Sequence, residues 1–188
     1  MKFLTVLMSL LFITSASAGI LIEPQIGYIL SSKFDGTATL SGPGAGTLTA
    51  NYKSSGPEYG GRLGYQAMGL MGGLTYGHSS FSSNSIGQST GTLTTNNMGA
   101  FVGYNAPILL RAWLAYNFSA KSSLPSTELE GNSKEIGIGF TGLPFLSVNF
   151  IYRMYDFTKF TTSGTTYTAT NFNPKEMELA ISAPFNLF

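Results

Sequence analysis

The sequence contains no cysteine, one histidine and one tryptophan. Without cysteine there is no disulfide framework and there are no thiolate ligands, and one histidine is too few for a transition-metal cluster. No glycine motif that cradles phosphate is present. We therefore expect no metal site, no nucleotide site and no other cofactor.

Charge is scarce as well. Charged residues make up 10% of the chain, whereas a soluble globular domain carries about 25%. After residue 18, the nine Lys and Arg side chains balance nine Asp and Glu side chains, so this part is formally neutral. No basic patch indicates nucleic acid as a partner.

Long hydrophobic runs are also missing, apart from one at the N-terminus. Lys2 precedes a mainly apolar run over residues 3–13, and Ala16-Ser17-Ala18 has the pattern of a cleavage site. These features predict a signal peptide over 1–18. A membrane-anchoring helix is the alternative, but the run is shorter than the roughly 20 residues that span a bilayer. With no other apolar run of that length, the mature part, 19–188, can cross a membrane only as strands closed into a barrel.

What the mature part does show is apolar residues at every second position, interrupted by Gly, Pro, Asn and Ser. This pattern predicts an all-β protein. We expect eight strands, at 20–31, 57–67, 70–79, 94–104, 108–119, 134–142, 145–155 and 174–185.

The connections between these strands alternate between short and long. The short ones are Met68-Gly69, Ala106-Pro107 and Leu143-Pro144, and the long ones are 32–56, 80–93, 120–133 and 156–173. Outer-membrane barrels have short periplasmic turns and long extracellular loops. The alternation predicts an antiparallel up-and-down transmembrane β-barrel with both termini on the periplasmic side.

The two faces of each predicted strand differ in chemistry. One face is apolar, and the other carries all three arginines and five glutamates. We expect these polar residues to form a network inside the barrel: Glu23, Glu58, Arg62, Arg111, Glu135, Arg153, Glu176 and Glu178. A slip of one residue would turn each arginine toward lipid, at a cost of about 2–4 kcal/mol per arginine.

Aromatic residues on the apolar face fall at two depths, as in the girdles of membrane barrels. The predicted external girdle contains Tyr28, Tyr59, Tyr76, Tyr116 and Tyr152. The predicted periplasmic girdle contains Tyr65, Tyr104, Phe140 and Phe185. Trp113 is expected to fill the interior beside Arg111, where a cation–π contact is within reach.

Three segments carry a resemblance to known proteins: Glu23-Pro24-Gln25-Ile26-Gly27-Tyr28, Gly61-Arg62-Leu63-Gly64-Tyr65 and the closing Ser182-Ala183-Pro184-Phe185-Asn186-Leu187-Phe188. Over its mature length the chain resembles the small eight-stranded outer-membrane barrel proteins, the group of the OmpA transmembrane domain and OmpX. The resemblance implies a location in the outer membrane of a Gram-negative bacterium and insertion by the barrel-assembly machinery. It also implies a terminal aromatic assembly signal, which is either Phe188 or Phe185.

The sequence indicates the function less specifically than the fold. We expect a non-enzymatic integral outer-membrane protein with a structural or surface-contact role. Its partners would be outer-membrane lipid and lipopolysaccharide, and a surface ligand bound by hairpins near 37–52 and 157–172. The alternative is a narrow channel for small solutes, which the surplus of five inner carboxylates over three arginines motivates.

A more remote hypothesis is a lipid A-modifying enzyme. His78 and Ser80 form an H-x-S pair on the outward face, similar to the pair that lipid A deacylases among small barrels use. No carboxylate that would orient the histidine lies near it in the sequence, and activation of a nucleophile usually needs such a group.

Overall fold

The computed structural model describes residues 18–42, 45–85, 88–143 and 145–187. The predicted signal peptide, apart from Ala18, and Phe188 lie outside these residues. Within the described residues no helix could span a membrane. The strands are β1 (Gly19–Ser41), β2 (Gly46–Ala67), β3 (Leu70–Ser85), β4 (Gln88–Ala106), β5 (Leu110–Leu124), β6 (Thr127–Leu143), β7 (Leu146–Thr162), β8 (Thr165–Phe172), β9 (Lys175–Ser182) and β10 (Phe185–Leu187).

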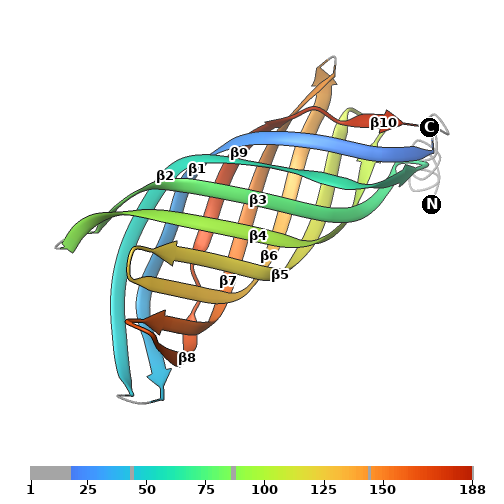
Figure 1. Cartoon of the computed structure of the whole chain (residues 1–188). Coiled ribbons are helices and arrows are strands. Elements are labelled where there is room, and N and C mark those ends of the chain that lie inside the picture. The colour runs from blue at the N-terminus through green and yellow to red at the C-terminus, as the bar shows by residue number, and fades with distance from the viewer. Residues whose placement is uncertain (1–17, 43–44, 86–87, 144, 188) are drawn as a thin grey trace, which may run out of the picture.

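These strands form one antiparallel ring of eight. Each of β1 to β7 pairs with the next strand in sequence, and β9 pairs with both β7 and β1, which closes the ring (Figure 1). β8, β9 and β10 are successive segments of the eighth strand, and all three pair with β1. The predicted eight-stranded antiparallel barrel is confirmed.

The register fixes the slope of the strands. Residues that lie opposite one another on neighbouring strands form a row around the barrel. The row that starts at Lys53 on β2 passes through β1, β9 and the other strands. It returns to β2 at Leu63, ten residues away. Such a stagger requires strands tilted by about 40°. Each step from one strand to the next along this row therefore moves about 3 Å along the barrel axis, away from the hairpins. Two residues along one strand span about 5 Å of the same axis.

The strands are much longer than predicted, because most of each expected long loop is paired strand. β1 continues to Ser41 and β2 resumes at Gly46, so the expected loop 32–56 is largely a hairpin. The other three expected loops are likewise occupied by the outer ends of β3 to β8. Their Ser, Thr and Gly composition is typical of loops, but pairing with the neighbouring strand satisfies the backbone.

At the opposite end the turns are short and apolar. Met68, Leu109 and Phe145 all have positive φ, at 51°, 63° and 61°. The second turn extends to Leu109, so β5 begins at Leu110 and not at the predicted 108. The side chains of Met68 and Phe145 are 69% and 81% exposed, so the apolar surface continues over this rim.

Proline explains one interruption of the eighth strand. β1 pairs with β10 over Ile20–Ile22 and with β9 over Gln25–Lys33. Between these two ladders Pro24 lies opposite the Ala183-Pro184 break, and neither proline has an N–H to donate. A single bond, from the N–H of Ala183 to the carbonyl of Pro24 (3.0 Å), connects the strands there.

Three bulges change which residues face outward. β1 carries one extra residue between Ile29 and Ser32, β5 carries one between Asn117 and Ala120, and the β6–β7 ladder shifts beside Thr158. An extra residue inverts the alternation beyond it. As a result Lys33, Lys121 and Lys159 are exposed on the outside, although alternation counted from the middle of each strand would place them inside.

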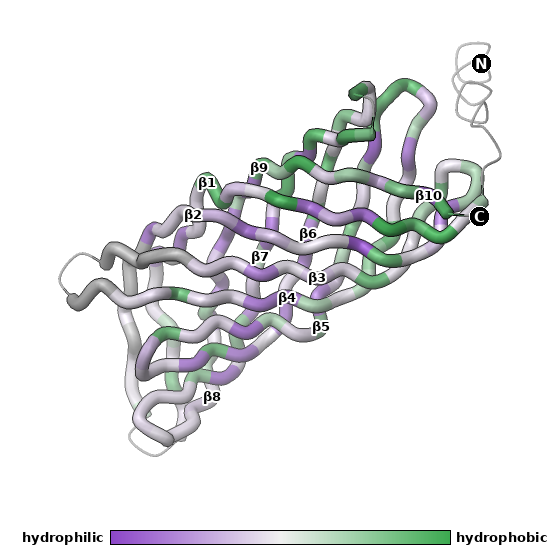
Figure 2. The backbone as a smooth tube through the Cα atoms, turned by 45° about the horizontal axis from the view of Figure 1, so that its top comes forward, coloured by the Kyte–Doolittle hydropathy of each residue, from purple (hydrophilic) through white to green (hydrophobic). Residues whose placement is uncertain are grey.

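The outer wall and the interior differ as predicted. Hydrophobic residues are concentrated toward the end that carries the short turns, and the hairpin end is more hydrophilic (Figure 2). Inside, the polar middle lies between two apolar clusters. The one toward the hairpins contains Tyr155, Phe157 and Phe172, and the other contains Leu21, Met71 and Phe101.

Candidate functional site

The structure brings the predicted interior residues together in two connected charged clusters. Their exposed fractions lie between 1% and 4%: Glu23, Glu58, Arg62, Arg111, Glu135, Arg153, Glu176 and Glu178. All eight come from the middle of the strands, where the alternation turns them away from lipid. None of the three arginines projects into the bilayer zone.

The first cluster surrounds Glu23. Its carboxylate accepts hydrogen bonds from Arg111 and from the Ser182 hydroxyl (2.5 Å), and Arg62 lies 3.5 Å away. Arg111 also donates to the Oδ1 atom of Asn149 (2.8 Å), and Arg62 donates to Gln25 (3.0 Å). A buried ion is stable only when its polar atoms have hydrogen-bond partners, and these amide and hydroxyl groups supply such partners. They are therefore part of the cluster.

Trp113 links the two clusters. Its ring nitrogen donates to Glu135 (2.8 Å), and the guanidinium carbon of Arg62 lies 3.7 Å from its ring centroid. Arg111, the neighbour expected from the sequence, is farther from the ring, at 5.3 Å. The closest cation–π contact therefore involves Arg62, a pairing that strand alternation alone does not reveal.

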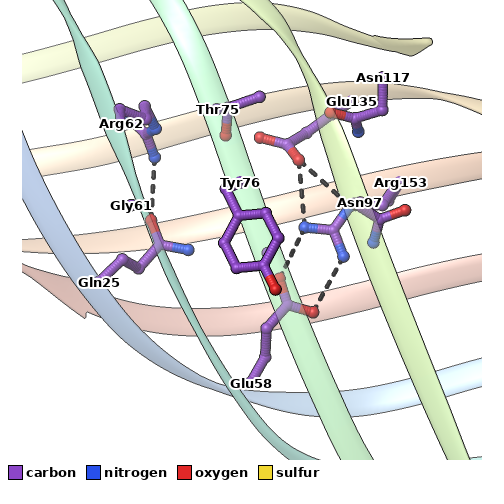
Figure 3. Close-up of a pocket in the computed structure, with 11 residues that line it drawn as sticks. Gln25, Glu58, Gly61, Arg62, Thr75, Tyr76, Asn97, Asn117, Glu135 and Arg153 are labelled. Carbon is purple, nitrogen blue, oxygen red and sulfur yellow. Dashed lines mark hydrogen bonds and ion pairs between the residues drawn. The ribbon is translucent and has the colours of Figure 1, made fainter. Parts of the chain in front are cut away.

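The second cluster is built on Arg153. Its guanidinium contacts four carboxylates: Glu58 at 3.0 Å, Glu135 at 3.1 Å, Glu178 at 3.4 Å, and Glu176. Figure 3 shows Glu58 and Glu135 approaching it from two sides.

Two further members of this cluster, Tyr155 and Asn97, are not part of the predicted network. Tyr155 donates to Glu176 (3.3 Å) and accepts a hydrogen bond from the Asn97 amide (3.0 Å). Both lie on the inward-facing alternation of their strands. Strand alternation therefore places both inside, although the predicted network contains only charged residues.

A small cavity lies among the charged residues. The cavity bordered by Gln25, Arg62, Asn97 and Arg153 has a volume of about 10 Å³ (Figure 3), which holds about one water molecule. Among the residues that the structure describes, no three His, Cys, Asp or Glu side chains are arranged to hold a metal ion. The inner carboxylates bind guanidinium groups, and the arrangement acts as a packed polar core.

All nine predicted girdle residues lie on the outward face, and Phe185 pairs with Ile22 at the rim with the short turns. The register and tilt place the five external tyrosines within about 4 Å of one depth, although they belong to five strands. They form a band around the outer wall, and their role as a membrane girdle stays a prediction.

His78 belongs to this outer wall. Its Nδ1 atom lies 2.7 Å from the Oδ1 atom of Asn96, and its ring lies 4.8 Å from the ring of Tyr59. Asn96 also accepts from the Tyr76 hydroxyl (3.2 Å). No hydrogen bond joins His78 to Ser80 within the described residues, and the partner of the histidine is an amide, not a carboxylate.

A second charged group lies above the tyrosines, outside the membrane-spanning segments. Glu130 is 2.5 Å from Lys121 and 3.7 Å from Lys159. The hydrogen bond with Lys121 lowers the pKa of Glu130 and raises the pKa of Lys121. These two lysines therefore share an internal counterion.

No protein-family model and no curated protein matches this sequence. Among solved structures, neisserial surface protein A is similar with a TM-score of 0.51 and 13% identity, over 89% of this chain and 99% of the other. The outer membrane protein OprG from Pseudomonas aeruginosa is similar with a TM-score of 0.53 and 12% identity, over 92% and 99%. The chain has the fold of the small eight-stranded outer-membrane β-barrel proteins.

Proposed function

We propose that the protein is a non-enzymatic integral outer-membrane barrel with a structural or surface-contact role, and that its hairpins face the cell exterior. The observation that carries this proposal is the contrast between a closed interior and long hairpins. The cavity bordered by Arg62 and Arg153 between the charged clusters has a volume of about 10 Å³, whereas β1 and β2 run for 23 and 22 residues. A membrane-spanning strand needs only about 9–11 residues.

The β1–β2 hairpin offers the most direct contact surface. The last β2–β3 pair joins Lys53 to Asn84, and β3 ends at Ser85. β2 continues outward to Gly46, and within the described residues this outer part pairs with β1 alone. Such a free strand edge can accept a strand from another molecule by β-augmentation.

Lysines placed on this edge test the contact role, because charged side chains on an edge strand oppose further pairing. Thr47→Lys with Thr49→Lys is expected to reduce the adherence of bacteria that express the chain to matrix-coated surfaces. Thr161→Lys with Thr166→Lys is the matched control, since both hairpins contain a Thr–Thr hydrogen bond, Thr37–Thr49 (3.1 Å) and Thr161–Thr166 (3.0 Å). Unchanged adherence in the edge variant, or equal loss in both variants, argues against the contact role.

Conductance tests the channel alternative. In a planar bilayer the folded protein is expected to show no steady single-channel current, because buried ion pairs close the interior. Reproducible steady current from correctly folded protein would favour the channel. Location is tested separately, by recovery of the chain in the outer-membrane fraction. A closed barrel extracted from that fraction should migrate differently on a denaturing gel before and after boiling.

A further inference from the structure

All six lysines after residue 18 lie on the outer surface near the hairpin end, whereas all three arginines lie inside. Four of these lysines share one hydrogen-bonded row across neighbouring strands. Lys53 pairs with Lys33, Lys33 pairs with Lys175, and both Lys175 and Lys134 pair with Met154. We call Lys33, Lys53, Lys134 and Lys175 the lysine row.

Three adjacent members of the lysine row repel one another. Residues paired across antiparallel strands have Cβ atoms about 4.5–5.5 Å apart, and like charges at such positions are destabilising. Lys33 has a lysine on both sides. None of the four forms an ion pair within the described part of the chain, although Asp35 and Asp156 occupy the next outward-facing positions on β1 and β7. Within the described residues, no carboxylate therefore forms a salt bridge to the row.

The depth of the row indicates where an external counterion would lie. Because the row slopes, Lys134 lies about 3 Å above the level of the girdle tyrosines and Lys53 about 15 Å above it. This is the headgroup side of the girdle, where lysines extend toward anionic lipid groups. A phospholipid headgroup layer is only about 5–7 Å deep, which is shallower than the row.

We propose that the lysine row binds the phosphate groups of a phosphorylated glycolipid of the outer leaflet, of the lipopolysaccharide type. Such a headgroup carries phosphates on several sugars and so at several depths. The bulge in β1 supports the assignment, because it turns Lys33 outward between Lys53 and Lys175. The inference rests on the proposed outer-membrane location and adds the recognised lipid to it.

The test uses the full mature chain, folded in detergent and titrated with diphosphorylated lipid A, with binding followed by native mass spectrometry. Lys33→Gln with Lys175→Gln is expected to weaken binding at least about tenfold, since each lysine near an anionic surface contributes several-fold in affinity. Lys121→Gln with Lys159→Gln removes the same charge from the same surface, but from lysines that already share Glu130. This control is expected to change affinity less than about threefold. Equal weakening by the two pairs, or no weakening by the first, overturns the proposal.

Two further binding experiments use the unaltered chain, so their results do not depend on whether a variant folds. Lipid A from which both phosphates have been removed should bind as weakly as the lysine-row variant. Inorganic phosphate at millimolar concentration should not displace the lipid. Equal binding of the dephosphorylated lipid, or displacement by free phosphate, overturns the assignment to a phosphorylated lipid. Heat-dependent gel migration of the same samples reports barrel formation, so failure of lipid recognition remains distinct from failure of the proposed function.

Discussion

Trp113 and Gly137 are direct cross-strand partners, and the Trp113 ring occupies the space where a Gly137 side chain would begin. A Cβ atom on Gly137 would lie 2.0 Å from the Cζ2 atom of Trp113. The glycine thus makes room for the side chain that links the two charged clusters.

Gly137→Ala should therefore destabilise the barrel by about 1–3 kcal/mol, the usual cost of overpacking a core. The free energy of unfolding in lipid vesicles, measured by urea titration, checks this. Gly72→Ala is the control, because its nearest contact is the Phe101 carbonyl oxygen at 3.4 Å. Equal stability of the two variants would contradict the packing described.

Arg153→Met should cost about 3–5 kcal/mol, since removal of one partner from a buried ion pair leaves uncompensated charge. Four glutamates lose their shared cation in this variant. Adding Glu58→Gln and Glu176→Gln should restore part of the lost stability, again measured by urea unfolding in vesicles. A triple variant no more stable than the single one would show that charge compensation is not what Arg153 provides.

Deletion of Leu30 should leave the barrel folded, with the same resistance to detergent before boiling. Leu30 has no partner on β9 and lies within the register shift between β1 and β2, so its removal yields an unbroken ladder and keeps Lys33 outside. Deletion of Ile26, within a regular part of the same ladder, should abolish the heat-dependent shift, because a slip of one residue exchanges the faces. If both deletions behave alike, the bulge does not absorb the extra residue.

His78→Ala should lower stability by about 1 kcal/mol through loss of the hydrogen bond to Asn96. Neither this variant nor the unaltered protein should release fatty acid from lipid A. Release by the unaltered protein that disappears in His78→Ala would establish the enzymatic alternative instead.

The membrane-facing part of the fold was predictable because lipid imposes a local rule. Every second side chain must be apolar, so the faces of Tyr28, Arg111 and Tyr116 can be assigned from their immediate neighbours. Sequence alternation also located Glu58 and Arg153 on the inner face. That the two meet at 3.0 Å depends on register between distant strands, which no local pattern contains.

The hairpin end of the barrel was harder to predict, for two physical reasons. Above the membrane neither face meets lipid, so hairpin strands rich in Ser and Thr have the composition of loops. Bulges also invert the alternation, so the outward positions of Lys33 and Lys121 cannot be inferred by counting from the middle of β1 or β5. The lysine row becomes visible only when the ladders are known.

The ring is closed by the first and last strands, through β1 with β9 and β10. An N-terminal fragment that ends before β8 leaves the outer edge of β1 without a partner strand, so the ring cannot close until the last segments of the chain are present. Closure of the barrel therefore depends on the C-terminal segments of the chain. A premature stop that removed only β9 and β10 would be expected to yield degraded protein, not a smaller barrel.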